Sequence, residues 1–131
     1  MKRRLCFTSS KFWPVPGEEE RTNPGVFGET LARWVRDELI ARGRDITKEP
    51  IPEDWGWVVM VSRKPITLWV GCANDEGSSD KWSVFVEAEQ SAIQKLFKRI
   101  DTKSPVMELE HQLELLIKAE KECSSVHWSL A

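Results

Sequence analysis

The sequence has no tyrosine, two histidines and three cysteines, and no apolar run near the roughly 20 residues that span a bilayer. Cys6, Cys72 and Cys123 are odd in number and form no Cys-x-x-Cys pair, so neither a disulfide framework nor a zinc site is expected. Free cysteines are typical of a reducing compartment, and we expect a cytoplasmic protein without metal or cofactor. Only Leu5-Cys6-Phe7 follows the basic start, which is too short for a signal peptide.

An excess of either charge is also lacking. The 19 basic and 21 acidic residues give a net charge of -2, and the basic residues are scattered among acids. This pattern argues against a nucleic-acid partner, and the absence of a long apolar run argues against a membrane partner. The 131 residues contain no repeat, linker or low-complexity tract, so we expect one domain over residues 1–131.

The segment 55–88 carries three apolar runs that alternate with a period of two, which predicts an antiparallel meander. Pro65 and the polar loop 74–80 separate the runs, because both favour turns. One face of each predicted strand carries Trp55, Trp57, Val59 and Val61 on the first, Ile66, Leu68, Val70 and Cys72 on the second, and Trp82, Val84, Val86 and Ala88 on the third.

Apolar residues at helical spacing predict an amphipathic helix over 26–42. Asn23 and Pro24 are a typical cap and first residue for such a helix, and Gly43 is suited to end it. The helical positions are Phe27, Leu31, Trp34, Val35 and Leu39.

Further elements are expected on either side of the meander. Residues 3–9 predict a strand at the edge of the sheet, and residues 46–51 a short edge strand bounded by prolines. A short helix over 93–100, a longer helix starting at Ser104, and a last strand over 126–130 follow. Grouped strands with separate helices indicate an α+β two-layer sandwich, with helices on one face of a mainly antiparallel sheet.

Two tryptophans have two interpretations each. Trp69 has small neighbours on its face of the strand and Phe85 on the next strand, so it is either an exposed aromatic platform for a ligand or core. Trp13 lies in the proline- and glycine-containing loop 12–25, which is either functional or a connector that Trp13 pins to the body.

Acidic residues cluster in three predicted loops. The clusters are Glu18-Glu19-Glu20, Glu53-Asp54, and Asp75-Glu76 with Asp80. Each is ordinarily a solvated loop. If the clusters converge at one end of the sheet, they form an acidic patch suited to a basic protein.

A second class of function is also open. Glu53 and Asp54 beside Trp55 suggest acid and base groups next to a sugar stacked on tryptophan. His127 is a further polar group, or the partner of a cysteine nucleophile, either Cys72 or Cys123. Adjacent carboxylates point to opposite sides of an extended chain, however, which hinders joint catalysis. We assign no catalytic residue.

The layout resembles the small, acidic, single-domain immunity proteins of bacterial toxin systems, and the run Glu53-Asp54-Trp55-Gly56-Trp57 is similar to runs in poorly characterised bacterial families of this size. The chain lacks the strong acidity of some such inhibitors. The resemblance implies an interaction role and no residue-level assignment.

We therefore predict a non-enzymatic module that binds another protein through the sheet face and loop ends around Trp13, Trp55, Trp69 and the acidic loops. A homodimer through a strand edge or a helix is compatible with this role. The alternative is a small sugar- or metabolite-binding domain or hydrolase with a tryptophan-lined cleft. A deep pocket that holds a carboxylate together with His127 favours the alternative, whereas a gently concave acidic surface favours protein binding.

Overall fold

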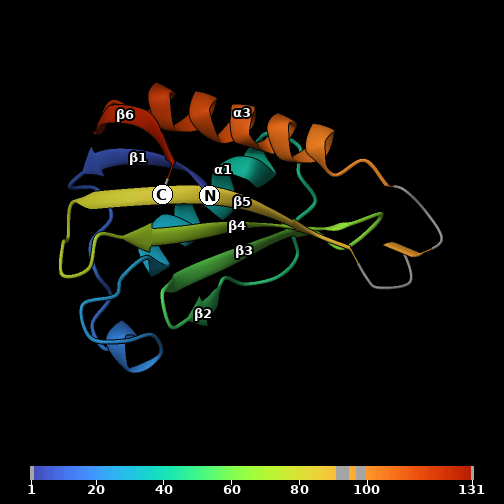
Figure 1. The fold of residues 1–131 in the computed structure, drawn as a ribbon. Helices are drawn as coiled ribbons and strands as arrows, with labels where there is room; N and C mark the ends of the chain where they lie inside the picture. The colour runs from blue at the N-terminus through green and yellow to red at the C-terminus, as the bar shows by residue number, and fades with distance from the viewer. Residues whose placement is uncertain (1, 91–94, 97–99, 131) are drawn as a thin grey trace.

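The computed structural model describes residues 2–90, 95–96 and 100–130, which form a six-stranded antiparallel sheet with helices on one face (Figure 1). This arrangement confirms the predicted α+β architecture. The strands lie in the order β2-β3-β4-β5-β1-β6. The strands are β1 (Arg3–Ser9), β2 (Ile51–Glu53), β3 (Gly56–Ser62), β4 (Thr67–Asn74), β5 (Lys81–Glu89) and β6 (Cys123–Leu130), and the helices are α1 (Glu29–Ala41), α3 (Lys103–Ala119) and the short 3₁₀ helix η1 (Glu18–Glu20).

The predicted meander is confirmed as β3, β4 and β5. Val59 pairs with Val70, and Val70 pairs with Val86, so the three valines form one row on one face of the sheet. Trp55 is the exception to the predicted pattern. It lies in the turn between β2 and β3, outside the strand period, and so does not share the face of Trp57.

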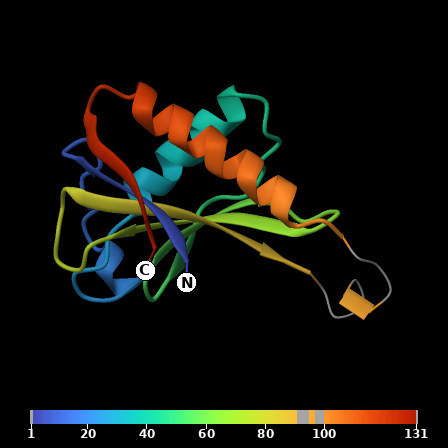
Figure 2. The ribbon, with the colours of Figure 1, turned by 45° about the horizontal axis from the view of Figure 1, so that its top comes forward.

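Both helices cover the same face of the sheet (Figure 2). Their apolar sides are buried in the core with the valine row. The fully buried or nearly fully buried apolar side chains of α1 and α3 are Leu31, Ala32, Val35, Leu39, Leu109, Leu113, Leu116 and Ile117. Within the described residues, no helix is both long and apolar enough to cross a membrane. The other face, which no described helix covers, is called the open face below.

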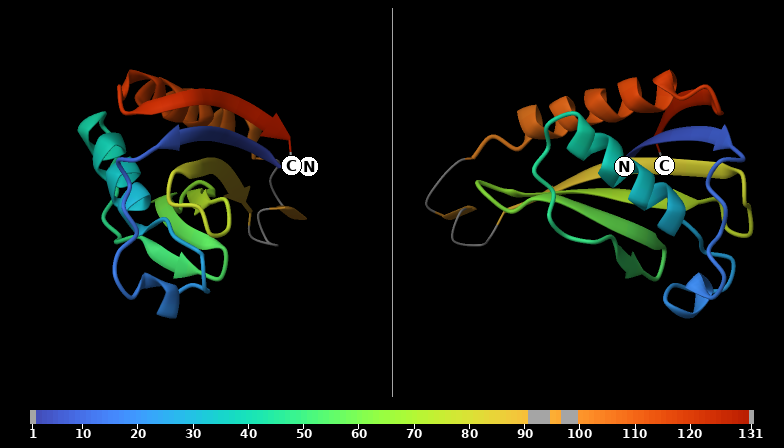
Figure 3. Two further views of the ribbon diagram at one scale, coloured as in Figure 1. Left: turned by 90° about the vertical axis from the view of Figure 1, so that its left-hand side faces the viewer. Right: turned by 180° about the vertical axis from the view of Figure 1, so that it is seen from behind.

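The strand predicted at residues 3–9 exists, but its predicted place at the edge is wrong. β1 lies between β5 and β6, because the C-terminal strand pairs with it and takes the edge (Figure 3). The strand predicted at 46–51 forms later in the chain, over Ile51–Glu53, where it pairs only with β3. Ile46 is instead buried in the core.

The predicted end of α1 is confirmed, whereas its predicted start is not. Gly43 ends α1 as predicted: its φ is +100°, and the next amide, that of Arg44, donates to the Leu39 carbonyl at 3.0 Å. The predicted start is wrong, because α1 begins at Glu29. α3 begins at Lys103, where Asp101 accepts hydrogen bonds from the first amides. The helix predicted over 93–100 lies largely outside the described residues.

A buried phenylalanine anchors the loop that precedes α1. The Phe12 side chain is fully buried and packs on the rings of Phe7, Trp34 and Trp82, with centroids 5.2 to 6.3 Å away. Trp13 does not pin this loop, since its side chain is 70% exposed. Phe12, and not Trp13, therefore anchors this loop to the body of the protein.

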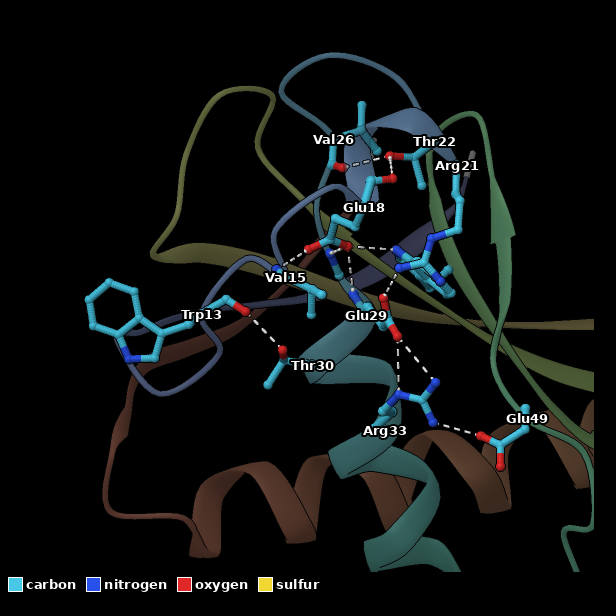
Figure 4. Close-up of polar contacts among 12 residues, drawn as sticks. Trp13, Val15, Glu18, Arg21, Thr22, Val26, Glu29, Thr30, Arg33 and Glu49 are labelled. Carbon is cyan, nitrogen blue, oxygen red and sulfur yellow. Dashed lines mark hydrogen bonds and ion pairs between the residues drawn. The ribbon is translucent and has the colours of Figure 1, made fainter.

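A buried carboxylate fixes the start of α1 (Figure 4). The Glu18 side chain is fully buried and accepts four hydrogen bonds, from the amides of Val15, Gly28 and Glu29 and from the Trp57 indole, at 2.7 to 3.2 Å. Two of these amides are unsatisfied donors at the N-terminus of a helix, where negative charge is favoured. A side chain ten residues upstream thus provides the cap that we had assigned to Asn23.

Ion pairs extend this arrangement along α1. Glu29 bridges Arg21, at 2.5 Å, and Arg33, at 3.1 Å, and Arg33 also contacts Glu49 at 2.6 Å. The Arg21 guanidinium lies 5.0 Å from the centre of the Trp57 ring. The loop before α1, the helix and β3 are therefore joined by polar contacts.

Replacing Glu18 by alanine should destabilise the fold by roughly 2 to 4 kcal/mol, because buried N–H donors lose their acceptor. Urea unfolding followed by circular dichroism measures the change. Glu20→Ala, which alters an exposed neighbour, is the control and should change stability by less than about 0.5 kcal/mol. Equal stability of both variants would contradict this role for Glu18.

Candidate functional site

Three connecting segments meet at one end of the sheet (Figures 1 and 3). Asn74 ties two of them together: its side-chain oxygen accepts from the Phe27 amide at 3.0 Å, and its nitrogen donates to the carbonyls of Gly25, at 3.0 Å, and Ser78, at 2.8 Å. The Asn23 side chain donates to the Asp54 carbonyl at 3.1 Å and adds the third segment. These bonds hold the three segments as a continuous rim.

The rim encloses a broad groove of about 950 Å³ on the open face. Its floor is formed by strand residues whose side chains point away from the helices, and its walls by the three segments. The lining residues are Arg4, Cys6, Asn23, Pro24, Val26, Asp54, Trp55, Ala73, Asn74, Asp75, Glu76, Ser83 and Ser129.

An aromatic trio, Trp55, Trp69 and Phe85, borders the groove. Trp55 stacks on Trp69 with ring centres 6.0 Å apart, and Phe85 lies 5.3 Å from Trp55 and 5.9 Å from Trp69. Each such pair contributes about 0.5 to 1.5 kcal/mol beyond the buried area. Phe85 is buried, whereas Trp55 remains 39% exposed. Trp69 alternates with the core residues Leu68 and Val70 and therefore lies on the open face. Its side chain is half-buried, so it is neither a fully exposed platform nor part of the core.

Gly71 makes room for this trio. A Cβ atom on Gly71 would lie 2.2 Å from the tip of the Phe85 ring. The pair sits directly opposite across β4 and β5, so the ring lies flat over the glycine backbone. Glycine is therefore required here by close approach of a ring.

Two cations lie over the Phe85 ring of the trio. The ammonium of Lys2 and the guanidinium of Arg4 lie 4.3 and 4.5 Å from the centre of the Phe85 ring, distances typical of cation–π contacts. Lys2 also pairs with Glu87 at 2.8 Å, and Arg4 donates to the Ser83 hydroxyl at 3.4 Å. Among the described residues that line the groove, Arg4 is the only cation.

Three carboxylates, Asp54, Asp75 and Glu76, line the groove and are exposed. The described part of the chain shows no ion pair to any of them. Of the three, Asp75 acts on Cys6 in the groove floor: burial raises the pKa of the Cys6 thiol, the Asp75 carboxylate raises it further, and the Arg4 guanidinium lowers it.

The structure brings together five of the predicted site residues. Asp54, Trp55, Asp75 and Glu76 line the groove, and Trp69 stacks beside it. Asp54 of the second acidic cluster and Asp75 and Glu76 of the third therefore line the same groove, whereas Glu53 and Asp80 do not.

The remaining predicted residues lie elsewhere. Glu18 is a buried structural group and was wrongly placed on an acidic surface. Glu19 borders the groove only indirectly, through a 2.6 Å bond from the Gly25 amide. Glu20, Glu53 and Trp13 are exposed outside the groove lining, and Trp13 receives a hydrogen bond from Thr30 through its carbonyl.

The groups proposed for catalysis do not assemble in this groove. His127 is exposed on the edge strand β6 and is not part of the groove lining. Cys72 lies in the core under the helices, where burial raises the pKa of its thiol, and two strands separate β4 from β6. Among the described residues, no cluster of three or more metal-ligating side chains is present.

Sequence reasoning missed Arg4, Cys6 and Ser83 on the floor of the groove. A signal existed, because each alternates with a predicted core residue and so must point to the other face. The rim residues Asn23 and Asn74 had no such signal, since their roles come from contacts between loops distant in sequence.

No protein-family model, curated protein or solved structure matches this chain. The interpretation of the groove therefore depends on its own chemistry.

Gly71→Ala should displace Phe85 and cost roughly 1 to 3 kcal/mol of stability, because the added methyl group overlaps the ring. Near-ultraviolet circular dichroism reports the trio directly and should weaken. Thr67→Ala, on the same face of β4, is the control and should leave that signal intact. A preserved spectrum in Gly71→Ala would show that the ring does not depend on the glycine.

Asp75→Asn should speed alkylation of Cys6 by iodoacetamide at neutral pH. The Asp75 carboxylate helps to raise the pKa of this thiol, so its removal lowers that pKa and increases the thiolate fraction. Peptide mass mapping separates Cys6 from Cys72 and Cys123. Glu76→Gln is the matched control, and an effect as large as that of Asp75→Asn, or no effect of either, counts against the assigned geometry.

Proposed function

We propose that this chain is a binding module for another protein, with the groove and the aromatic trio on the open face as its docking surface. One observation supports the proposal most strongly. Partly exposed, stacked tryptophans adjoin a wide groove on the face that no described helix covers.

The trio supplies the apolar part of the surface. Tryptophans that are stacked on each other lose little conformational entropy on binding and offer a large contact area, and tryptophan is enriched among residues that dominate interface energies. The exposed part of Trp55 lies at the edge of the groove, where a partner side chain can pack on it.

The charges indicate the kind of partner. The groove lining has three carboxylates, Asp54, Asp75 and Glu76, against one guanidinium, Arg4. Because the carboxylates outnumber the guanidinium, the lining has a net negative charge, which attracts lysine and arginine side chains. A basic segment of the partner therefore fits this groove best.

The alternative function, a sugar- or metabolite-binding domain or hydrolase, receives less support from the geometry. A deep pocket that holds a carboxylate together with His127 would favour it, whereas His127 lies outside the groove lining. A broad groove beside an apolar patch is more typical of a docking surface than of a small-ligand site. Inhibition of a bacterial toxin remains a prediction from the resemblance.

Affinity capture with the tagged chain from a lysate of its host, followed by native mass spectrometry, should recover a stoichiometric protein partner. Retention of a small-molecule mass alone would favour the alternative. With the partner in hand, Trp55→Ala should weaken binding by at least about tenfold, since an interface anchor costs more than about 1.4 kcal/mol when truncated.

The triple variant Asp54→Asn, Asp75→Asn, Glu76→Gln should slow association with that partner and reduce its dependence on salt. The matched control is Asp37→Asn, Asp45→Asn, Glu108→Gln, which changes the net charge equally through exposed residues outside the groove. Equal association rates for the two triple variants would contradict a basic segment in the groove. Neutralising Glu18, Glu19 and Glu20 does not serve this test, because Glu18 stabilises the fold.

A further inference from the structure

The two edges of the sheet are protected to different degrees. β2 has three residues, and they include Pro52, which has no amide hydrogen, and the charged Glu53. Both features are typical of edges that resist further strand pairing. β6 has eight residues, Cys-Ser-Ser-Val-His-Trp-Ser-Leu, with no proline, lysine, arginine or carboxylate. The fold therefore exposes one long, uncharged edge.

A β-bulge limits the part of β6 that is regular enough to pair with another strand. The register between β1 and β6 shifts between Cys6 and Thr8, and Ser125 has a φ of +54°. Such bulges interrupt pairing locally. After the bulge, β6 pairs regularly with β1 from His127, opposite Cys6, to Leu130, opposite Arg3.

The chain's own contacts hold this segment in an extended form. The Trp128 indole donates to the Glu114 carboxylate on α3 at 3.2 Å, and the Arg3 guanidinium lies 4.4 Å from the centre of its ring. Val126 and Trp128 pack towards the core, which leaves His127 and Ser129 on the open face. A strand that is already ordered loses little conformational entropy when a second strand pairs with it.

We propose that the outer edge of β6, over Val126–Leu130, pairs antiparallel with the same segment of a second copy and joins the two sheets into one. A strand edge pairs with itself about a two-fold axis, and this is the isologous contact that most homodimers use. Since β6 contains no formally charged side chain, self-pairing brings no like charges opposite each other. Leu130, which is 61% exposed, lies within the paired segment.

This dimer places two docking surfaces side by side. Ser129 both belongs to the paired segment and lines the groove. When the two-fold axis is perpendicular to the sheet, the two open faces continue into each other and both grooves lie on one side. The dimer follows from the edge alone and stands whether or not the groove binds a basic protein.

Sedimentation velocity over a range of concentrations tests the dimer with the intact chain. We expect a monomer–dimer equilibrium in the micromolar range, because the paired segment is short. His127→Lys should raise the dimer dissociation constant by at least about tenfold, since two like charges then lie near the axis. Ile51→Lys places the same charge on the other edge, on an exposed residue of β2, and should leave the constant unchanged.

Hydrogen exchange of the unmodified chain keeps the test independent of how the variants fold. The amides of Val126–Leu130 should become more protected as the concentration rises, while those of β2 should not change. A monomer at every concentration would falsify the proposal, even if the β6 edge bound an extended peptide of another protein. A dimer that Ile51→Lys weakens as much as His127→Lys, or one without added protection in β6, also overturns it.

Discussion

The buried carboxylate of Glu18 is the contact on which the arrangement of the site depends. A charged group is removed from water at low cost only when hydrogen bonds replace its hydration, and four N–H donors from a loop, a helix and a strand do so here. Because these donors come from separate elements, one side chain fixes the start of α1 and the path of the chain before it. That path forms one wall of the groove.

The two faces of the sheet differ in composition, because successive side chains of a strand point to opposite faces. One set of alternate residues is apolar and buried under the helices, where it supplies most of the core. The other set contains Arg4, Cys6, Gly71 and Phe85, which are unequal in size and charge. A missing side chain at Gly71 lets Phe85 lie against the sheet, and the ring in turn supports the tryptophans and the two cations.

The closeness of the chain ends links the groove to the sheet edge. β1 supplies Arg4 and Cys6 to the floor, and its neighbour β6 supplies Ser129. Because Ser129 belongs to both, the groove and the proposed pairing edge of β6 are contiguous.

By itself, the sequence determined the meander, the helix stripes, the end of α1 at Gly43 and the α+β class, because these follow from local periodicity and backbone preference. It also indicated Asp54, Trp55, Asp75 and Glu76. Only the tertiary structure decided that Glu18 is buried while Glu19 and Glu20 are exposed, that β1 is internal, and that Trp55 leaves the core face to join Trp69. Local sequence patterns cannot distinguish the three glutamates of the run 18–20. Glu18 is buried because it contacts residues 10 to 39 positions away in the sequence.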